Sequence, residues 1–510
     1  METIWVLDDQ LTWRHPALAG GPRKDAVVLM IESRKRARRL RYHQQKLVLV
    51  YAAMRHFAAD LRAAGWAVDY HLLPETADFS SALDRHAKTF RPSRIVLMEP
   101  NDWPMAQAIP AIRKRLGLPV DLLPTNFFLC GRDEFRRWAG KSKRLLMENH
   151  YRRMRLELGY LVDDDGKPEG GSWNLDVENR RTFANFATER PARPPSPVRE
   201  PPDEATRDVI AMVAREFPEH PGKADGFWLP VDRARALRWL ERFVRERLAN
   251  FGAYEDTMAT EDPLLYHSIL SPLLNIGLLS PAECVDAAIG AYRKGEAPLN
   301  SVEGFTRQII GWREFINGVY WLKMPDYVES NGLDAGRSLP PWFYTGRTDL
   351  NCVRQCLNQV IDTAYNHHIQ RLMVLGNFLI LTEVEPRQAL RWFLEMYCDA
   401  NDWVMAANVI GMVLHADGGF MATKPYVAGS GYISRMSDYC VGCRYKPAVK
   451  TGPEACPFNY LYWNFFDRHA DRFRSNPRVS MMVRTWEKKT DVEKDAVRSS
   501  AREFLNGSLA

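Results

Sequence analysis

Four of the eight cysteines are spaced as ligands of one metal centre would be. Cys440 and Cys443 are separated by two residues, and Cys456 follows after twelve more and precedes a proline. A Cys-x2-Cys pair supplies two neighbouring ligands, and Cys-Pro at the closing ligand is a pattern of iron–sulfur sites. A fourth ligand is required. We favour Cys352, with Cys356 one helical turn later as the alternative.

The spacing of these cysteines also indicates which metal they bind. Structural zinc usually takes two Cys-x2-Cys pairs close together, whereas here one pair combines with distant single cysteines. Clustered cysteines in a reducing compartment favour metal ligation over disulfides. We therefore expect a [4Fe–4S] cluster, with a pair of buried, inert thiols as the alternative. The isolated Cys130, Cys284 and Cys398 are interpreted as core residues.

Two adjacent histidines lie inside the long loop that these cysteines close. His367 and His368 are flanked by Tyr365 and Arg371. Histidine changes its charge near neutral pH and often transfers protons in catalysis. We expect both histidines in the middle of a helix, where neighbours point about 100° apart, so that only one faces a given pocket. Buried core histidines are the alternative.

Other polar residues could hold an anionic cofactor. Tyr266–Pro272 combines small hydroxyls with a helix start, which suits phosphate. A simple N-cap at Ser271 is the alternative. Gln308–Phe315 is expected to be a helix with polar and aromatic residues on one side. Asp399 lies 28 residues beyond Arg371, so the two could pair across adjacent helices and stabilise the charge of a cofactor.

Five short β-rich runs precede these residues in the chain. They are Thr3–Leu7, Ala26–Ile31, Ala67–Leu73, Arg94–Met98 and Val120–Leu123. Helical patterns lie between them, the clearest being Gln45–Gly65, so we expect an α/β doubly wound parallel sheet. The strand ends carry Asp8–Gln10, Glu32 and Glu99. No G-x-G-x-x-G follows the first strand, which argues against a nucleotide bound by the usual phosphate turn. The basic run Arg34–Arg41 is either a solvated face or a phosphate site.

The remainder of the chain is predicted to be a linker followed by helices. We place the α/β domain at 1–130, an irregular linker at 131–204 and an all-α domain at 205–510. The linker includes the proline-rich Pro191–Pro202. Helical periodicity is found in Ala234–Phe251, Pro281–Lys294, Val302–Trp321, Asn351–Leu381 and Pro386–Tyr397.

The composition is that of an ordinary globular protein. Hydrophobic residues make up 46% and charged residues 26% of the 510 positions. No run approaches the length of a transmembrane helix, and the N-terminus lacks the pattern of a secretory signal, so we expect a cytoplasmic protein that does not bind membranes. The net charge of +6 permits nucleic-acid binding without requiring it.

These segments together resemble the photolyase/cryptochrome flavoproteins. The resemblance is carried by Tyr266–Pro272, Gly311–Phe315, the histidine pair and the turn 399–401. The four cysteines, Lys424–Tyr426 and Gly431–Cys440 are similar to the iron–sulfur bacterial branch, which contains the prokaryotic (6-4) photolyases and related cryptochromes. The similarity spans almost the whole chain and includes Asp9–Leu11 and Ala53–Phe57.

The resemblance implies several cofactors. It places a [4Fe–4S] cluster on Cys352, Cys440, Cys443 and Cys456, and a bent FAD in the helical domain. The FAD-binding residues that it implies are Tyr254, His267, Ser268, Leu270, Ser271, Gln308, Trp312, Arg371, Asp399 and Asn401. An antenna, 6,7-dimethyl-8-ribityllumazine, would lie near Asp9, Gln10, Glu32 and residues 42–46. Mg²⁺ near Asp256 is a further implication.

The resemblance also implies an activity and a partner. The activity is that of a DNA lyase, the light-driven repair of (6-4) photoproducts in UV-damaged DNA, carried out by a monomer. The lesion must be flipped out, because a stacked base cannot meet the flavin. His368 would donate a proton, while His367, Tyr426 and Tyr432 would shape the lesion pocket. Trp392 would belong to the path that reduces the flavin, and the cluster would be structural or serve DNA binding.

Three residues depart from the pattern of the family. Tyr344 stands in place of a tryptophan of the electron path, Phe393 in place of a tyrosine, and Asp8 in place of a glycine of the antenna motif. We therefore expect photoreduction that is slower or rerouted. The rerouting candidates are Trp342, Tyr397 and Trp403. A blue-light photoreceptor with the same cofactors is the alternative function, and a flavin-free, zinc-bearing DNA-binding module is a third.

Overall fold

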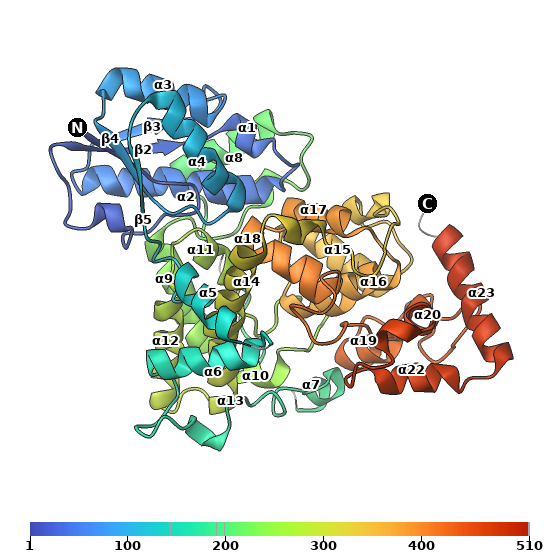
Figure 1. Cartoon of the computed structure of the whole chain (residues 1–510). Helices are drawn as coiled ribbons and strands as arrows, with labels where there is room; N and C mark the ends of the chain where they lie inside the picture. The colour runs from blue at the N-terminus through green and yellow to red at the C-terminus, as the bar shows by residue number, and fades with distance from the viewer. Residues whose placement is uncertain (143, 190, 198, 508–510) are drawn as a thin grey trace.

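A parallel sheet built from the first part of the chain stands at one end of the molecule (Figure 1). The computed structural model describes residues 1–142, 144–189, 191–197 and 199–507. The strands are β1 (Glu2–Trp5), β2 (Ala26–Ile31), β3 (Val68–His71), β4 (Arg94–Met98) and β5 (Val120–Leu123), in the order β3-β2-β1-β4-β5. All paired neighbours run parallel, so the predicted strands and the predicted parallel sheet are confirmed.

Helices cover both faces of this sheet. Ile4 and its register partner Val28 pack in the same core as α2 (Gln44–Ala63). The next residues along the two strands, Trp5 and Leu29, pack with α3 (Phe79–Phe90) and α4 (Trp103–Leu116). Strands buried on both faces read as continuous apolar runs, and every residue of β2 is buried. The sheet is therefore doubly wound.

The segment expected to be an irregular linker contains three helices. They are α5 (Arg132–Lys141), α6 (Met147–Leu158) and α7 (Phe183–Glu189), and residues 143, 190 and 198 lie outside the described part. These helices are rich in charged residues, but a few of their apolar side chains, such as Phe135 and Met154, are buried. Helix α8 (Glu204–Glu216), assigned above to the helical domain, packs instead against α2 beside the sheet (Figure 1).

The rest of the chain is helical, as predicted. The α-helices are α9 (Arg233–Glu246), α10 (Leu248–Tyr254), α11 (Ser271–Asn275), α12 (Pro281–Arg293), α13 (Leu299–Thr306), α14 (Glu314–Lys323), α15 (Asn351–Thr363), α16 (Asn377–Leu381), α17 (Pro386–Met396), α18 (Asp402–Ala406), α19 (Ser430–Met436), α20 (Pro457–Arg468), α21 (Ala470–Phe473), α22 (Ser480–Glu487) and α23 (Asp491–Gly507). Within the described residues, we find no helix with the length and apolar character needed to cross a membrane.

The long helix predicted over 351–381 is interrupted. The pattern over 351–381 breaks where α15 ends at Ala364, which takes left-handed backbone angles with φ 57°. His367 lies in the following turn and His368 at the start of the next helix, so their predicted mid-helix position is wrong. Single π-helical stretches, which are frequent at functional sites, follow at η7 (Gln370–Gly376), and also occur at η4 (Arg307–Arg313) and η8 (Ala407–Val413).

The basic run after β2 joins the sheet to the helical part. Arg36 Nε donates to Asp8 at 2.7 Å, and its NH2 donates to Asp102 at 3.1 Å. The two terminal nitrogens of Arg39 donate to the two carboxylate oxygens of Asp402, both at 2.9 Å. Arg36 is half-buried between two carboxylates, whereas Arg39 is exposed, so the predicted solvated face describes Arg39 but not Arg36.

A lysine of α2 makes a second link to the helical part. Lys46 is buried, and its Nζ donates to the carbonyl oxygens of Leu394 at 3.1 Å and Ala400 at 2.5 Å. Burial lowers the pKa of this ammonium group to about 7. The α/β unit therefore supplies part of the hydrogen bonding around the turn that carries Asp399.

One buried histidine gives a test of acid sensitivity. His150 on α6 packs against the rings of Phe135 and Trp138, and neither of its nitrogens has a hydrogen-bond partner in the described part of the chain. Burial lowers its pKa to about 3. The folded pKa lies below the unfolded one, so the stability is fully present above about pH 6.5 and is lost as the pH falls towards 3.

His150→Leu is therefore expected to raise the free energy of unfolding by about 2 kcal/mol more at pH 5 than at pH 8, because only the wild type must give up a histidine proton on folding at pH 5. Urea unfolding at both pH values measures this difference. An equal effect at the two pH values would show that packing alone is responsible.

Candidate functional site

A buried ion pair lies at the centre of the helical part. The two terminal nitrogens of Arg371 donate to the two carboxylate oxygens of Asp399 at 2.8 and 3.0 Å, so the predicted pair is present. Ser271 Oγ donates to the same carboxylate at 2.6 Å, and Asn275 donates to the Asp399 carbonyl. Asn401 donates in turn to the Asn275 carbonyl at 3.0 Å. Four predicted cofactor residues thus share one hydrogen-bonded network.

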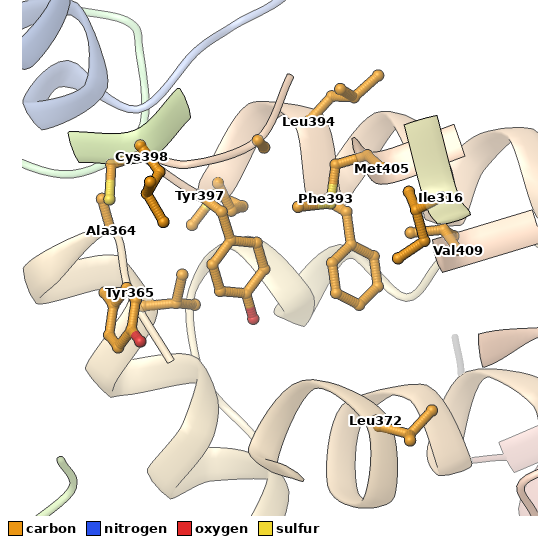
Figure 2. Close-up of a cluster of buried hydrophobic side chains, with 14 of the residues drawn as sticks. Ile316, Ala364, Tyr365, Leu372, Phe393, Leu394, Tyr397, Cys398, Met405 and Val409 are labelled. Carbon is orange, nitrogen blue, oxygen red and sulfur yellow. The ribbon is translucent and has the colours of Figure 1, made fainter. Parts of the chain in front are cut away.

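Aromatic rings enclose this ion pair. The Arg371 guanidinium carbon lies 4.0 Å from the ring centroid of Tyr397 and 5.2 Å from that of Tyr365. Figure 2 shows Tyr397 with Phe393 beside it, their ring centroids 5.4 Å apart. Burial lowers and the Asp399 carboxylate raises the pKa of Arg371, and the net shift is upward. The site therefore holds a permanent positive charge inside the protein.

Two histidines beside this pair have free ring nitrogens. The rings of His267 and His367 stack with centroids 4.1 Å apart and an interplanar angle of 11°. His267 Nε2 and both nitrogens of His367 are buried without a hydrogen-bond partner among the described residues. Burial lowers the pKa of His267 to about 3 and that of His367 well below its usual value. Buried polar atoms are rarely left unpaired, so these nitrogens mark a place for a ligand.

His368 has an unusual combination of properties. Its side chain is exposed, yet burial, followed by the charge of Arg371, lowers its pKa to about 4. His368 is therefore the member of the pair that a bound molecule could reach.

The predicted phosphate segment is a strained turn before α11. Ile269 has φ 57°, which is rare for a β-branched residue. Leu270 N donates to Ser268 Oγ at 3.4 Å, and the Ser268 carbonyl accepts from Trp239 Nε1 at 3.3 Å. The alternative of an N-cap at Ser271 is wrong, because Leu270 is the N-cap and the Ser271 hydroxyl bonds Asp399.

Gln308 and Trp312 lie on the π-helical stretch η4. Both side chains are partly accessible, although most of their neighbours on this helix are buried. Residues four apart on a helix share one face. They therefore form a polar and aromatic edge, as the sequence predicted.

Two of the predicted cofactor residues are occupied by other partners. The hydroxyl of Tyr254 donates to Glu189. The two Glu32 oxygens accept from Arg55 at 2.8 and 3.0 Å, and one of them also accepts from Tyr70 at 2.9 Å. Neither residue presents a free polar atom to a cofactor.

The two predicted tyrosines of the lesion pocket follow α18 and its π-helical extension. Tyr426 and Tyr432 are partly buried, and Tyr432 Oη lies 3.5 Å from Asp256 Oδ2. Burial and the neighbouring Asp176 raise the pKa of Asp256 to about 6. Burial, opposed by Arg307 and supported by further carboxylates, raises that of Glu255 to about 8. Several carboxylates are thus crowded beside Tyr432.

The four predicted cluster ligands come together in space. Burial and then the charges of Cys456, Cys356, Cys440 and Cys443 raise the pKa of the Cys352 thiol well above its usual range. Cys440 and Cys443 also raise the pKa of Cys456, and Cys443 raises that of Cys440. Each of the four thiols therefore lies near the other three. Among the four thiols, Cys356 raises the pKa of Cys352 alone. The pKa of Cys356 itself is raised by burial and lowered by Tyr439, without a contribution from the four thiols. This difference favours Cys352 as the fourth ligand.

A second cluster of possible metal ligands lies at the edge of the sheet. Asp69, His71 and His86 form the one group of three described residues whose ligand atoms all lie within 4.8 Å of one another. Asp69 Oδ2 bonds His71 Nε2 at 3.0 Å and His86 Nδ1 at 2.6 Å, while Arg85 donates to His71 Nδ1. His71 must then carry its proton on Nε2 and cannot bind a metal there. This group is a hydrogen-bonded network of the fold.

Two of the predicted antenna residues, Asp9 and Gln10, lie where the strand order reverses, between β1 and β4, whereas Glu32 follows β2. Such switch points bind ligands in open α/β sheets. Asn101 donates to Asp9 at 3.1 Å, and the amide oxygens of Gln10 and Asn101 are buried without partners in the described chain. Burial, followed by neighbouring carboxylates, raises the pKa of Asp9 to about 7. Asp8 instead points to Arg36.

A row of rings leads from a half-buried tryptophan towards Arg371. Successive centroids lie 5.0 Å apart from Trp342 to Phe343, 5.1 Å from Phe343 to Trp392, and 5.8 Å from Trp392 to Tyr397. Trp392 and Tyr397 are completely buried. The structure thus places two of the three predicted rerouting residues, Trp342 and Tyr397, in one row with Trp392.

Sequence reasoning missed several residues that build this site. Asn275 lies four positions after Ser271, and that helical spacing could have indicated its role. Gln370 and Tyr439, which hold the histidine turn, carry no local signal. Lys46 follows Gln44 and Gln45 at the start of α2, and its contacts with the helical part were not predicted.

Comparison with known proteins identifies the relatives of this chain. A family model described as deoxyribodipyrimidine photo-lyase-related protein matches residues 4–229. A (6-4) photolyase of Agrobacterium fabrum is 42% identical over 509 residues, which are 99% of each chain. An uncharacterized protein of Acanthamoeba polyphaga mimivirus is 34% identical over 107 residues, 21% of this chain and 80% of that protein.

A solved structure has the same fold. A bacterial class III photolyase from Agrobacterium tumefaciens covers 98% of this chain and 91% of its own, with a TM-score of 0.56 and 18% identity. This likeness supports the arrangement of a parallel sheet with a mainly helical remainder. The family follows from the sequence match, which is 42% identical over 99% of each chain. The chain belongs to the photolyase family, in the branch of the (6-4) photolyases.

Proposed function

We propose that the protein is a DNA lyase that uses light to repair (6-4) photoproducts in UV-damaged DNA. The observation that carries the proposal is the accessible His368, next in the chain to a buried histidine with free nitrogens and close enough to Arg371 to feel its charge. The family assignment supports it. A blue-light sensor would need no acid at a lesion, so His368 favours repair over signalling.

FAD is the proposed cofactor of the helical part. The donor set fits it: a buried guanidinium, a fixed carboxylate and histidine nitrogens without protein partners. Arg371, Asp399, Asn401, Gln308 and Trp312 would hold the ring system, and His267, Ser268, Leu270 and Ser271 the phosphates. When bound and reduced, FAD would supply the electron that light makes available for repair.

His368 is the proposed proton donor. Its pKa of about 4 in the protein alone means that it is neutral at pH 7 before DNA binds. DNA phosphates and the negative charge that develops on the lesion favour the imidazolium, and they therefore raise this pKa in the complex. Tyr426, Tyr432 and His367 would form the walls against which the flipped lesion rests.

The proposed cluster is [4Fe–4S] on Cys352, Cys440, Cys443 and Cys456. The charges of Cys440 and Cys443 act on both Cys352 and Cys456, which supports a shared centre. Single-ion ligands would lie closer together than these do, since the described residues contain no cysteine set within 4.8 Å. The cluster would tie the loop 440–456 to the start of α15.

We propose two further ligands, an antenna molecule and Mg²⁺. The unpartnered oxygen of Gln10 and the buried Asp9 fit a polar antenna molecule such as the lumazine, whereas Glu32 has no free oxygen for it. Crowded carboxylates around Asp256 fit Mg²⁺, since a divalent cation would offset both the burial and the mutual repulsion that raise the pKa values of Asp256 and Glu255.

Trp392→Phe is expected to slow light-driven reduction of the bound flavin by about 10-fold or more, because phenylalanine is a poor electron relay and Trp392 connects Trp342 with Tyr397. Absorbance under blue light with an external reductant measures the rate. Trp403→Phe is the matched control, since Trp403 is equally buried but packs against Phe128. Equal slowing in both variants would remove the row of rings from the path.

The proposed activity is tested by illuminating the purified protein with oligonucleotides that carry either a (6-4) or a cyclobutane lesion. We expect the (6-4) lesion to be restored and the cyclobutane lesion to persist. Restoration of the cyclobutane lesion alone would assign a different substrate, and restoration of neither would refute repair.

A further inference from the structure

The turn that carries the histidine pair is held by one buried glutamine. Gln370 Oε1 accepts from His367 N at 3.1 Å, in the manner of a capping box. Its Nε2 donates to Gln359 Oε1 at 2.6 Å and to Tyr439 Oη at 3.0 Å. The amide cannot flip, because its oxygen would then face the Gln359 oxygen. Gln370 therefore fixes the backbone of His367 relative to two other segments.

Tyr439, one of these partners, precedes the cluster ligand Cys440. Its side chain is 1% exposed. Its hydroxyl oxygen accepts from Gln370 Nε2 at 3.0 Å. Asn351, at the start of α15, donates to the Tyr439 carbonyl at 2.8 Å. The tyrosine is therefore fixed at both its backbone and its hydroxyl.

Helix α15 reaches the same turn from the other side. It carries Cys352 in its first turn, and the Cys356 carbonyl one turn later accepts from Asn366 Nδ2 at 3.2 Å. Asn366 in turn holds Arg371, whose Nε donates to the Asn366 carbonyl at 2.8 Å. Both segments that carry the proposed cluster ligands thus touch the turn between them.

We propose that Tyr439 is a positioning residue, which acts through Gln370 to hold the histidine turn in register with the loop that binds the cluster. The proposal rests on the proposed function, because it gives the cysteine loop a part in placing His367 and His368 against the lesion. Tyr439 takes no part in electron transfer in this proposal. The link consists of two hydrogen bonds, from the Gln370 amide to the Tyr439 hydroxyl and from the His367 backbone N–H to Gln370.

The test compares Tyr439→Phe, Gln370→Leu and the double variant in the holoprotein. Tyr445→Phe is the matched control, since Tyr445 lies near Cys443 and Cys456 on the same loop. Iron and FAD contents are measured first, then light-driven repair, and finally the rate at which diethyl pyrocarbonate modifies His367 in the dark, followed by peptide mass spectrometry. The last readout does not depend on catalysis.

We expect both single variants to keep their iron and FAD but to lose about 10-fold or more in repair, because small misplacements of catalytic groups are costly. His367, 1% exposed in the wild type, should become modified several-fold faster. The double variant should match the stronger single variant within about twofold, since both changes break one link. Tyr445→Phe should behave like the wild type.

Three results would overturn the inference. They are wild-type repair and wild-type His367 protection in Tyr439→Phe, additive losses in the double variant, or a repair loss that follows loss of iron. Failure of the proposed function is distinguishable, because the wild type itself would then leave (6-4) lesions unrepaired while His367 modification still reported on the link.

Discussion

His368→Ala is expected to abolish most light-driven repair while the purified protein keeps its FAD and iron. A positioned general acid contributes about 10²-fold to 10⁴-fold to a rate, and His368 is the accessible histidine of the pair. Repair yield per absorbed photon on a (6-4) oligonucleotide measures the effect. His368→Gln should show the same loss, since a glutamine can hydrogen bond but cannot donate a proton.

The control for this prediction is His56→Ala. His56 lies on α2 and bonds Asp203 and Thr206, neither of which belongs to the network of Arg371 and Asp399. This variant should repair like the wild type. If His368→Ala repaired normally, or if both variants lost activity equally, His368 would have no part in the chemistry.

Cys440→Ala is expected to give protein that is colourless or insoluble, with less than about one iron per chain in place of about four. Loss of one ligand opens a corner of the cluster and leaves only Cys352, Cys443 and Cys456 to hold it. Iron analysis and the absorbance near 400 nm measure the effect. The loop 440–456 should then lose the protein contacts that it makes through the cluster.

Cys356→Ala separates the two candidates for the fourth ligand. Cys356 is as deeply buried as Cys352 and lies four residues away on the same helix, so the two variants are matched in position and burial. We expect Cys356→Ala to keep about four irons and Cys352→Ala to lose them. The reverse result would move the ligand to Cys356, and retention of iron in Cys440→Ala would refute the cluster.

The sequence predicted those features that arise from local patterns. Period and β-branched residues located all five strands, and the pattern of cysteines singled out four thiols that the structure brings near one another. The pairing of Arg371 with Asp399 was also predicted. Each of these follows from residue type and spacing alone.

The remainder depended on contacts between distant segments. Nothing local indicates that Ala364 takes left-handed angles, because the break is held by Asn366, which bonds the Cys356 carbonyl and the Tyr397 hydroxyl. The basic run after β2 looked like surface, yet its Arg39 meets Asp402 across 363 positions of sequence. Such tertiary partners override local propensity and cannot be seen in a single sequence.

The contacts of Lys46 limit how this protein could be recombined with its relatives. The ammonium group belongs to α2, but the carbonyls that it satisfies belong to Leu394 of α17 and to Ala400, which follows Asp399. A chimera that took its sheet from one homologue and its helices from another would have to inherit both sides of this junction together. If the helical half were expressed as a separate polypeptide, the Ala400 carbonyl would lose its hydrogen bond from Lys46. We expect the proposed cofactor site to be distorted in that polypeptide.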